Sequence, residues 1–424
     1  MRDAVGDEAP LRICLLSYRS NPHCGGQGVY VRNLSRALRD LGHRVTVVSG
    51  PPDPGLAAGV RLVRLPCLDL FDPAAPFRLP RLRELADPLN FIEWAGVSTM
   101  GFPEPFTFGL RAYGFLRPGI GDYDVVHDNQ SLSYGIWLLS RCAPTVATIH
   151  HPITVDRRFA VRAEPDVWKK LKQWRWHSFI GMQRRVARNL PMLITVSESA
   201  RGDIRRDFGL SGNRLRVVAN GIDTGLFRPV PGIAREPGRI IVTNSADMPL
   251  KGLGYLLQAV ADILSGRNHL KLVVVGMPKK NGAVERLVGA LGIGRWVEFT
   301  GRIDDAEFVS QYARASMAVI PSVYEGFGLP AGEAMACGVP VISTTGGALP
   351  EVVGDAGILV PPADPPALAE AIRALLDDPE RARRMGEAGL RRVLAQFSWR
   401  RAAERTVECY RETIRDHRRL RARS

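Results

Sequence analysis

The most constraining feature of this sequence is the stretch of residues 317–349, in which apolar runs alternate with glycine-rich and proline-containing turns. It opens with four apolar residues, as a buried strand does. A loop with Glu325, Gly326 and Gly328 follows, and Pro330 stands where the first helical turn tolerates a missing N–H. A second apolar run, residues 339–343, predicts a returning strand. The pattern indicates a strand–loop–helix–strand unit.

Two carboxylates, Glu325 and Glu333, lie eight positions apart in this unit, and we expect both near the helix N-terminus, Glu333 in the first turn. A helix N-terminus and a glycine loop attract anions such as phosphate. A carboxylate beside a phosphate would be repelled unless it faced hydroxyls. Glu333 is therefore a candidate to bind ribose hydroxyls, and Glu325 to bind sugar hydroxyls or to stabilise positive charge at a reacting carbon. The alternative is that Glu333 only complements the helix dipole and Glu325 only starts a turn.

Residues 325–342, EGFGLPAGEAMACGVPVI, resemble the E-x7-E signature of the family 4 glycosyltransferases. The resemblance implies retaining enzymes of the GT-B fold, an α/β class with two Rossmann-like domains that face an interdomain cleft. It further implies a C-terminal helix that crosses back to the N-terminal domain. We therefore expect an acceptor-side domain in residues 1–225 together with 398–424, and a nucleotide-sugar-binding domain in residues 226–397.

Length and composition agree with a two-domain globular protein. One hydrophobic core rarely grows beyond about 250–300 residues, and this chain has 424. No apolar run approaches the roughly 18–20 residues that cross a bilayer. Because the first ten residues are polar, we expect no signal peptide. Six scattered Cys with no C-x-x-C pair indicate reduced thiols. We expect a cytoplasmic protein.

The net charge of +14 is unevenly distributed. Residues 151–220 carry fifteen Lys and Arg against six Asp and Glu. Such a field favours anionic partners, namely phosphate-bearing donors, acidic lipid headgroups or nucleic acid. Of these we expect a nucleotide-sugar donor and no nucleic acid, with peripheral contact to the inner face of an anionic membrane as an open alternative. A general arginine bias explains the charge equally well.

The N-terminal region begins as a doubly wound sheet does. Apolar strands are predicted at residues 11–17 and 45–48, with a helix at 29–41 between them. The loop of residues 18–28 contains Gly25, Gly26 and Gly28, which suit a phosphate or the close approach of a sugar. A nicotinamide site is disfavoured, because the G-x-G-x-x-G spacing is absent and no acidic residue ends the second strand.

Polar residues follow two further predicted strands, 124–127 and 145–149. His127, Asp128 and His150 lie at carboxyl ends, where parallel sheets place ligand groups. The family resemblance implies that His150 faces the donor sugar. The triplet of residues 122–124, Asp-Tyr-Asp, precedes its strand, and we interpret it as structural.

Two aromatic segments leave alternatives open. Residues 50–118 predict an irregular insertion over the cleft with some helix. Three roles of this insertion stay open: it forms an acceptor pocket, it touches a membrane, or it is an ordinary satellite core. Residues 156–190 predict a basic helix containing Trp168, Trp174, Trp176 and Phe179. We expect these aromatics to pack on the domain, and the alternative is an interfacial helix at an anionic membrane.

The second domain contains the predicted phosphate site. Lys251, at a helix start, suits a diphosphate as a compact point charge. The family resemblance implies an Arg six positions earlier, where this chain has Ser245. Arg302 and Arg19 are the candidate substitutes for the missing cation, and the sequence does not decide between them. The resemblance also implies that the backbone at Arg302 and Ile303 borders the base.

These observations predict transfer of a glycosyl group from a nucleoside diphosphate sugar, with retention of configuration. The acceptor is an unidentified sugar, lipid-linked molecule or small molecule, and a cell-envelope glycan is one candidate. Family usage favours UDP over GDP. No cofactor or metal is expected, because Lys251 and helix N–H groups supply positive charge. The alternatives are a GT-B nucleotide-sugar epimerase and a non-catalytic nucleotide-sugar-binding protein. The predicted catalytic residues are Glu325, His150 and Lys251, and the predicted donor-binding residues are Gly25, Gly26, Gly28, Ser245, Lys251, Arg302, Ile303, Glu325, Gly326, Phe327, Gly328, Leu329 and Glu333.

Overall fold

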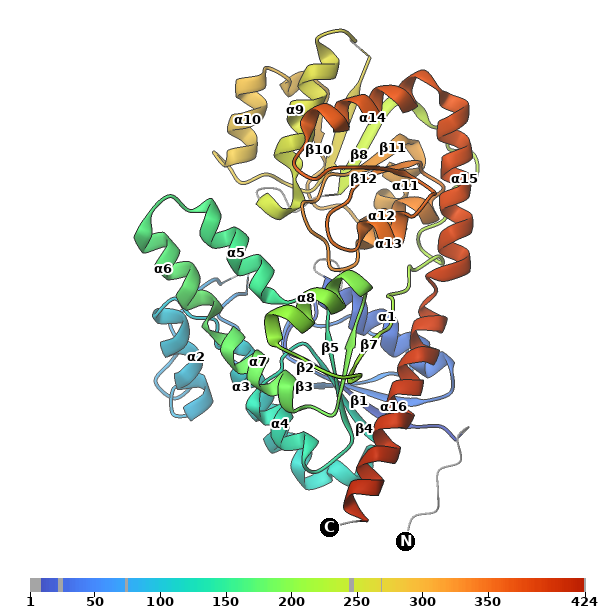
Figure 1. Cartoon of the computed structure of the whole chain (residues 1–424). Coiled ribbons are helices and arrows are strands. Elements are labelled where there is room, and N and C mark those ends of the chain that lie inside the picture. The colour runs from blue at the N-terminus through green and yellow to red at the C-terminus, as the bar shows by residue number, and fades with distance from the viewer. Residues whose placement is uncertain (1–8, 22–25, 73–74, 244–247, 268, 423–424) are drawn as a thin grey trace. The chain divides into compact units, whose positions relative to one another are not determined.

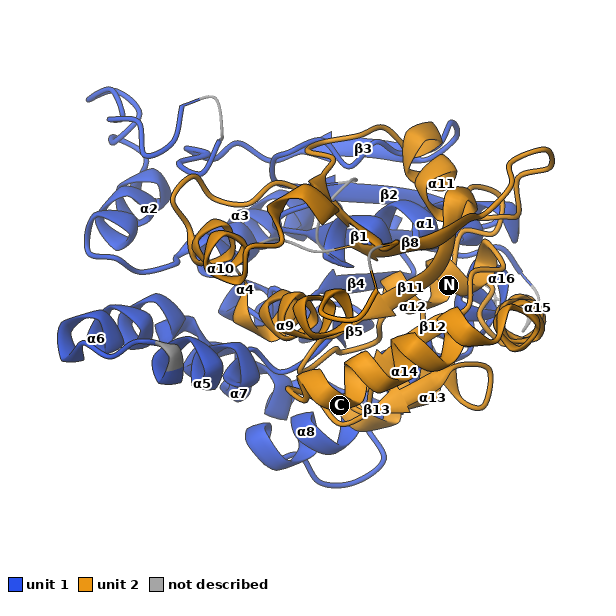
Figure 2. Cartoon of the chain, turned by 90° about the horizontal axis from the view of Figure 1, so that it is seen from above, with its two compact units in different colours: residues 1–196, 200–219, 399–424 blue, residues 197–199, 220–398 orange. Residues whose placement is uncertain are grey.

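A computed structural model describes residues 9–21, 26–72, 75–243, 248–267 and 269–422. The chain divides into two compact units, residues 1–196, 200–219 and 399–424, and residues 197–199 and 220–398 (Figures 1 and 2). The division falls at Asn220, whereas the sequence analysis placed it after residue 225. The reason lies in Ile222, whose N–H donates to Phe397 O at 2.8 Å and which forms a parallel bridge with Ser398, so this segment is bound to the second unit.

The first unit contains a parallel sheet of seven strands in the order β3-β2-β1-β4-β5-β6-β7. The strands are β1 (Arg12–Ser17), β2 (Arg44–Ser49), β3 (Arg61–Arg64), β4 (Val125–Asn129), β5 (Thr145–Ile149), β6 (Met192–Thr195) and β7 (Leu215–Val217). The helices are α1 (Gly26–Asp40), α2 (Pro88–Ser98), α3 (Glu104–Leu116), α4 (Tyr134–Ser140), α5 (Ile153–Ala163), α6 (Val167–Trp176), α7 (Ile180–Asn189), α8 (Glu198–Phe208) and α16 (Trp399–Arg421). Buried strands with apolar residues on both faces are typical of a parallel sheet covered by helices on each side.

Two hydrophobic clusters cover the two faces of this sheet. One joins β1, β2, β4 and β5 to α1 and α16, and the other joins the sheet to α3, α4, α7 and α8. The C-terminal helix α16 therefore belongs to the first unit, beside α1 (Figure 1), as the fold prediction requires. Buried Tyr410 of α16 packs against this face of the sheet.

The second unit contains a parallel sheet of six strands in the order β10-β9-β8-β11-β12-β13. The strands are β8 (Glu236–Thr243), β9 (Lys271–Val275), β10 (Val297–Phe299), β11 (Ala315–Ile320), β12 (Val341–Thr344) and β13 (Ile358–Val360). The helices are α9 (Leu253–Leu264), α10 (Ala283–Leu291), α11 (Asp305–Arg314), α12 (Leu329–Ala336), α13 (Leu349–Val353), α14 (Pro365–Asp377) and α15 (Pro379–Gln396). The strand–loop–helix–strand unit predicted for residues 317–349 is β11, α12 and β12.

Two details differ from the predictions made from the sequence. The segment predicted as one helix at residues 156–190 is broken after α5, where Glu164 is extended before Pro165, as residues preceding proline usually are. A similar break separates α14 from α15 at Asp378, whose carboxylate accepts from Arg381 N at 2.8 Å and caps α15. Finally, β3 forms the sheet edge inside the segment that was expected to be largely irregular.

The structure adds two facts on thiols and membranes. The five cysteines among the described residues form no disulfide. They are Cys14, Cys67, Cys142, Cys337 and Cys409. In the part of the chain that is described, no helix combines the length and the apolar character needed to span a bilayer.

Candidate active site

The centre of the predicted site in the second unit is an ion pair. Lys251 ends a short 3-10 turn, Pro249–Lys251, directly before α9. Its Nζ donates to Glu325 Oε1 at 2.7 Å, and Ser322 Oγ donates to the same oxygen at 2.8 Å. The Glu325 side chain is 12% exposed and that of Lys251 is 29% exposed. The carboxylate predicted to act on the sugar is thus held by the cation predicted to bind the diphosphate.

The loop that carries Glu325 packs tightly against the loop before α13. Ala348 N donates to Glu325 O at 2.9 Å, and a Cβ added to Gly347 would lie 2.2 Å from that oxygen. Gly328, at the start of α12, has a φ of +102°, which favours glycine. The glycines of this motif therefore set the shape of the loop, and with it the position of the Glu325 side chain.

Glu333 lies just beyond the first turn of α12, in which it was predicted to lie. The helix begins at Leu329, so Glu333 is its fifth residue, and its first turn contains no acidic side chain. The prediction of a first-turn position is wrong, because α12 starts directly after Gly328. The side chain is partly buried, and burial, with a smaller contribution from the charge of Asp305, raises the pKa of Glu333 to about 7.

The remaining predicted donor-binding residues of this loop have other contacts as well. Gly326 O accepts a hydrogen bond from Ser197 Oγ at 2.7 Å. The ring of Phe327 is buried and packs edge-to-face on Phe397, with 5.7 Å between the centroids. Leu329 is partly buried. Phe327 is thus a core residue of the second unit, and its backbone is what remains for a ligand.

The predicted base-binding and phosphate positions are only partly described. Ser245 lies outside the described residues. Arg302 is exposed and Ile303 is partly buried in the turn after β10. This turn is tied to the turn after β9, since Gly301 N donates to Gly276 O at 3.1 Å. Both turns follow the carboxyl ends of neighbouring strands of the second sheet.

In the first unit, His150 follows β5 and is held by Asn129 at the end of β4. The His150 Nε2 and Asn129 Oδ1 atoms are 2.7 Å apart. Asn129 Nδ2 donates to Gln27 O at 3.2 Å and to Ser17 Oγ at 3.3 Å. Because a carbonyl oxygen only accepts, this contact orients the amide and turns Oδ1 toward the imidazole, so Nε2 carries the proton.

The ionisation of His150 agrees with this tautomer. Burial lowers the pKa of His150 to about 3, so the ring is neutral at physiological pH. The Tyr30 ring packs edge-to-face on it at 4.7 Å, and His150 N donates to Gln130 Oε1 at 2.7 Å. With Nε2 protonated, Nδ1 presents a lone pair, which can accept a hydrogen bond but cannot donate one.

The other two strand-end candidates have internal partners. The His127 ring nitrogens contact Tyr410 Oη at 2.6 Å and Thr148 Oγ1 at 2.7 Å, and burial lowers the pKa of His127 to about 3. Asp128 accepts from Leu132 N at 2.8 Å, and burial raises its pKa to about 6. Both stabilise the unit from within, whereas Asn129, which the sequence analysis passed over, positions His150.

The glycine segment before α1 is partly helical rather than a loop. Gly26 and Gly28 lie in the first turn of α1, which begins three residues earlier than predicted. Gly28 is buried, and a Cβ there would lie 1.8 Å from Asn21 O, so the preceding loop packs directly on it. Gly25 lies outside the described residues.

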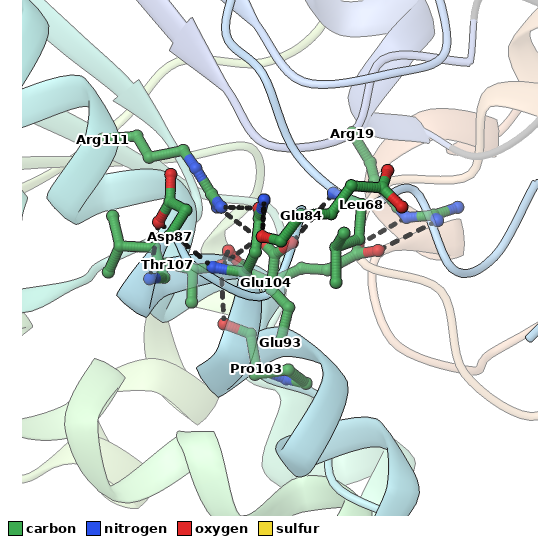
Figure 3. Close-up of polar contacts among 11 residues, drawn as sticks. Arg19, Leu68, Glu84, Asp87, Glu93, Pro103, Glu104, Thr107 and Arg111 are labelled. Carbon is green, nitrogen blue, oxygen red and sulfur yellow. Dashed lines mark hydrogen bonds and ion pairs between the residues drawn. The ribbon is translucent and has the colours of Figure 1, made fainter. Parts of the chain in front are cut away.

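Arg19, one of the proposed substitutes for the missing phosphate-binding Arg, is paired within the first unit. Its Nε donates to Glu104 Oε2 at 2.6 Å (Figure 3). Its Nη2 lies 3.7 Å from Asp69, and its guanidinium stacks on Phe71 at 5.1 Å. Arg12 pairs with Asp124 at 2.7 Å, so one carboxylate of the Asp-Tyr-Asp triplet has a partner within the unit. Among the described residues, no group of three or more His, Cys, Asp or Glu side chains is placed to hold a metal ion.

Comparison with known proteins then assigns the family. Residues 24–226 match the family model described as Glycosyltransferase Family 4, and residues 230–392 match Glycosyl transferases group 1. The chain is 48% identical over 409 residues to the MMP alpha-(1->4)-mannosyltransferase of Mycolicibacterium hassiacum, covering 95% of this chain and 98% of the relative. The chain belongs to the family 4 glycosyltransferases.

This family 4 glycosyltransferase is also similar to more distant proteins over nearly its whole length. It is 31% identical to D-inositol 3-phosphate glycosyltransferase 2 of Catenulispora acidiphila, covering 98% of each chain. Among solved structures, sucrose-phosphate synthase of Thermosynechococcus elongatus has a TM-score of 0.73 and 27% identity, covering 98% of this chain and 100% of that one. Together with the two parallel sheets, these likenesses confirm the predicted GT-B fold.

Proposed function

We propose that this glycosyltransferase transfers a mannosyl group from a nucleoside diphosphate sugar and forms an α-(1→4) linkage with retention of configuration. The 48% identity with an alpha-(1->4)-mannosyltransferase along nearly the full length of both chains carries this proposal. Forming an α-linkage from an α-configured sugar nucleotide is retention, which agrees with the expectation from the sequence. Uridine as the base remains the prediction of the sequence analysis.

The contacts in the second unit support a role for its ion pair in the reaction. Negative charge develops on the leaving diphosphate, and a fixed cation at that position lowers the barrier. Lys251 supplies this charge, and Glu325, held by Lys251 and Ser322, faces the sugar as its hydrogen-bond acceptor. We assign Glu333 to the ribose hydroxyls. In the first unit we assign the unprotonated Nδ1 of His150 to a hydroxyl of the transferred sugar.

The reaction proceeds on one face of the sugar in this proposal. Departure of the diphosphate gives the anomeric carbon oxocarbenium character, the acceptor hydroxyl attacks from the side of departure, and its proton passes to the leaving phosphate. Neither a covalent glycosyl intermediate nor a metal ion is part of the proposal. We therefore expect full turnover in excess EDTA, and loss of turnover that added Mg²⁺ or Mn²⁺ restores would contradict metal independence.

A donor and acceptor screen tests the activity. The purified chain is incubated with GDP-mannose, UDP-mannose and UDP-glucose, each with and without α-mannosides as acceptors, and nucleotide release and product are measured. We expect nucleoside diphosphate release that requires an acceptor, and a product whose anomeric carbon–proton coupling shows an α-linkage. Conversion of the donor when no acceptor is present, and with no release of nucleotide, would indicate an epimerase. Donor binding without any turnover would indicate a non-catalytic binding protein.

A further inference from the structure

Helix α6 presents its apolar side chains to solvent. All ten of its residues are described, and none is buried. The exposed apolar side chains and their exposed fractions are Val167 at 67%, Trp168 at 74%, Leu171 at 51% and Trp174 at 50%. A surface helix of a globular protein normally turns its apolar stripe toward the core. The expectation that Trp168 and Trp174 pack on the domain is therefore wrong.

Helix geometry places these four side chains together. At about 100° per residue they occupy an arc of about 120°, and Trp176 lies on the opposite side. Trp176 stacks on Phe102 with 5.1 Å between the centroids and contacts Phe71 edge-to-face at 5.6 Å. The packing prediction is confirmed for Trp176, and this contact anchors the inner side of α6. The four apolar side chains on the other side of the helix are each at least half exposed.

Cations border the arc. Lys170 flanks it on one side and Lys172 on the other, and Arg175 lies within it, between Leu171 and Trp168. The helix carries four Lys and Arg and no acidic residue. On the preceding helix α5, the Arg157 guanidinium stacks on the Trp174 ring at 4.2 Å, so a further cation lies at the indole face. The surface therefore combines large apolar side chains with positive charge at the same place.

The apolar surface extends beyond α6 to α2 and the loop before it. Both figures of the whole chain show α2 and α6 at the same end of the first unit, and Arg175 Nη2 donates to Thr99 Oγ1, next to the C-terminus of α2, at 2.8 Å (Figures 1 and 2). Large apolar side chains that are exposed in this neighbouring segment are Phe77, Leu79, Leu82, Phe91, Ile92 and Met100. Exposed large apolar side chains gathered in this number at one end of a unit are typical of an interaction site.

We propose that α6, together with the exposed apolar residues of α2 and its preceding loop, is a docking surface for an anionic lipid bilayer. Trp rings lie at the boundary between acyl chains and headgroups, and the Lys stems extend along apolar surface while their ammonium groups reach the phosphates. A basic helix with Trp and Leu on its apolar side lies in the plane of such an interface. The surface is independent of the proposed transfer reaction, since none of its residues is assigned to donor or sugar.

The composition of the surface favours a bilayer over the other occupants. Nucleic acid would explain the cations but gives no reason to expose Val167 and Leu171. A second copy of this chain would cover the apolar arc, but would bring four cations of α6 against the same four of its partner in a two-fold contact, which is unfavourable. An anionic bilayer complements both the charge and the apolar arc.

Vesicle flotation with the full chain tests the proposal. Vesicles of phosphatidylcholine with phosphatidylglycerol should bind the chain, and vesicles of phosphatidylcholine alone should bind it much more weakly. The double variant Lys170→Glu/Lys172→Glu should lower binding by at least roughly fivefold for each reversed charge. Replacing both exposed indoles, Trp168→Ala/Trp174→Ala, should lower it by roughly tenfold or more. Indole emission of the wild-type chain should shift to shorter wavelength on the anionic vesicles.

Matched variants at other positions distinguish docking through α6 from nonspecific adsorption to vesicles. Lys279→Glu/Lys280→Glu changes two exposed lysines of the second unit, and Leu394→Ser changes a leucine that is 57% exposed, against 51% for Leu171. Leu171→Ser should weaken vesicle binding, and these controls should not. The proposal is overturned if the wild-type chain ignores anionic vesicles, if the controls lose as much binding as the α6 variants, or if Leu171→Ser binds normally. If the wild-type chain does not bind vesicles but forms a dimer that the α6 variants abolish, the surface belongs to a contact with a second copy of this chain.

Discussion

Lys251 Nζ lies 2.7 Å from Glu325 Oε1, and the two residues follow neighbouring strands of the second sheet, β8 and β11. The carboxyl ends of parallel strands meet at one edge, where ligands of open α/β sheets bind. The chain therefore brings one positive and one negative group to this edge as a pair. We infer that neither is an isolated charge, and that the loss of one changes the electrostatics of the other.

Replacement of Glu325 tests the proposed role of this pair. We expect Glu325→Ala to lower kcat by roughly 10²–10³-fold, the range for loss of one preorganised electrostatic group. Ser322→Ala is the control, because it removes one neutral hydrogen bond to the same oxygen and should lower kcat far less. Circular dichroism should show an intact fold for both variants. Near-normal turnover of Glu325→Ala would remove Glu325 from the mechanism.

The stability of the second unit should depend on the ionisation of Glu333. Its pKa is raised from 4.5 to about 7, so the carboxyl is protonated in both the folded and the unfolded chain below pH 4.5. As the pH rises to 7, the unfolded state ionises more readily, and this group's contribution to the free energy of unfolding falls by up to ~3 kcal/mol. Glu333→Gln should therefore be more stable than wild type at pH 8 and no more stable at pH 4.5. Denaturant unfolding at the two pH values measures this difference.

Nucleotide binding should show the same ionisation. Hydrogen bonds from ribose hydroxyls favour the carboxylate, so binding should lower the pKa of Glu333, release a proton near pH 7 and strengthen from pH 6 to pH 8. Calorimetry in buffers of different ionisation enthalpy measures the proton directly. Glu333→Gln should bind nucleotide more weakly, by roughly 1–3 kcal/mol, and without this pH dependence. Unchanged affinity in the variant would contradict the ribose contact.

The tautomer of His150 should depend on Asn129. In Asn129→Asp the new carboxylate faces the imidazole, favours the imidazolium and raises the pKa of His150 from about 3. In a fraction of the molecules both ring nitrogens of His150 are then protonated, and Nδ1 no longer accepts a hydrogen bond from a hydroxyl. Because this fraction grows as the pH falls, kcat/KM of the variant should fall toward low pH. The wild-type enzyme should lack that dependence above pH 4. Nitrogen NMR of the ring reports the tautomer independently of activity.

Most of the fold was predictable because the apolar runs are long and separated by clear turn residues. The strands around Glu325 and His150 follow from such runs, and the polar groups after them follow from the rule for parallel sheets. Asn129 was not distinguishable from its neighbours His127 and Asp128, since all three end the same strand. Their different roles depend on the partners that the fold brings to them, which are Tyr410 of α16 and Thr148 for His127, the backbone of the next loop for Asp128, and Ser17, Gln27 O and His150 for Asn129. Spacing along one strand does not encode these partners.

The exposure of α6 was not predictable for a similar reason. A run of Trp and Lys at helical spacing specifies an apolar side and a charged border, but not whether the core or the solvent faces that side. Here Trp176 alone of the three tryptophans reaches the aromatic cluster with Phe102. The position of Glu333 in its helix depended on a single residue. The left-handed Gly328 precedes the helix, so α12 begins at Leu329, and Glu333 falls just beyond the first turn.

The segment of residues 50–118 provides a last prediction, which concerns stability. Glu93 is 4% exposed and accepts from Thr107 Oγ1 at 2.7 Å and from Leu68 N at 3.0 Å, and it pairs with the buried guanidinium of Arg111 (Figure 3). One carboxylate thus joins α2, α3 and the loop after β3. Truncation would leave the Arg111 charge buried without this partner, which typically costs roughly 3–5 kcal/mol.

We therefore expect Glu93→Ala to lower the free energy of unfolding of the first unit by that amount and to accelerate amide hydrogen exchange in α2 and α3. Glu387→Ala is the matched control, since it removes a carboxylate from an exposed pair with Arg383 and should cost less than about 1 kcal/mol. Comparable stability of the two variants would show that the Glu93 contacts do not hold the segment. Because α2 also carries part of the proposed docking surface, Glu93→Ala should weaken vesicle binding only as far as it unfolds α2, whereas Leu171→Ser should weaken it in a fully folded chain.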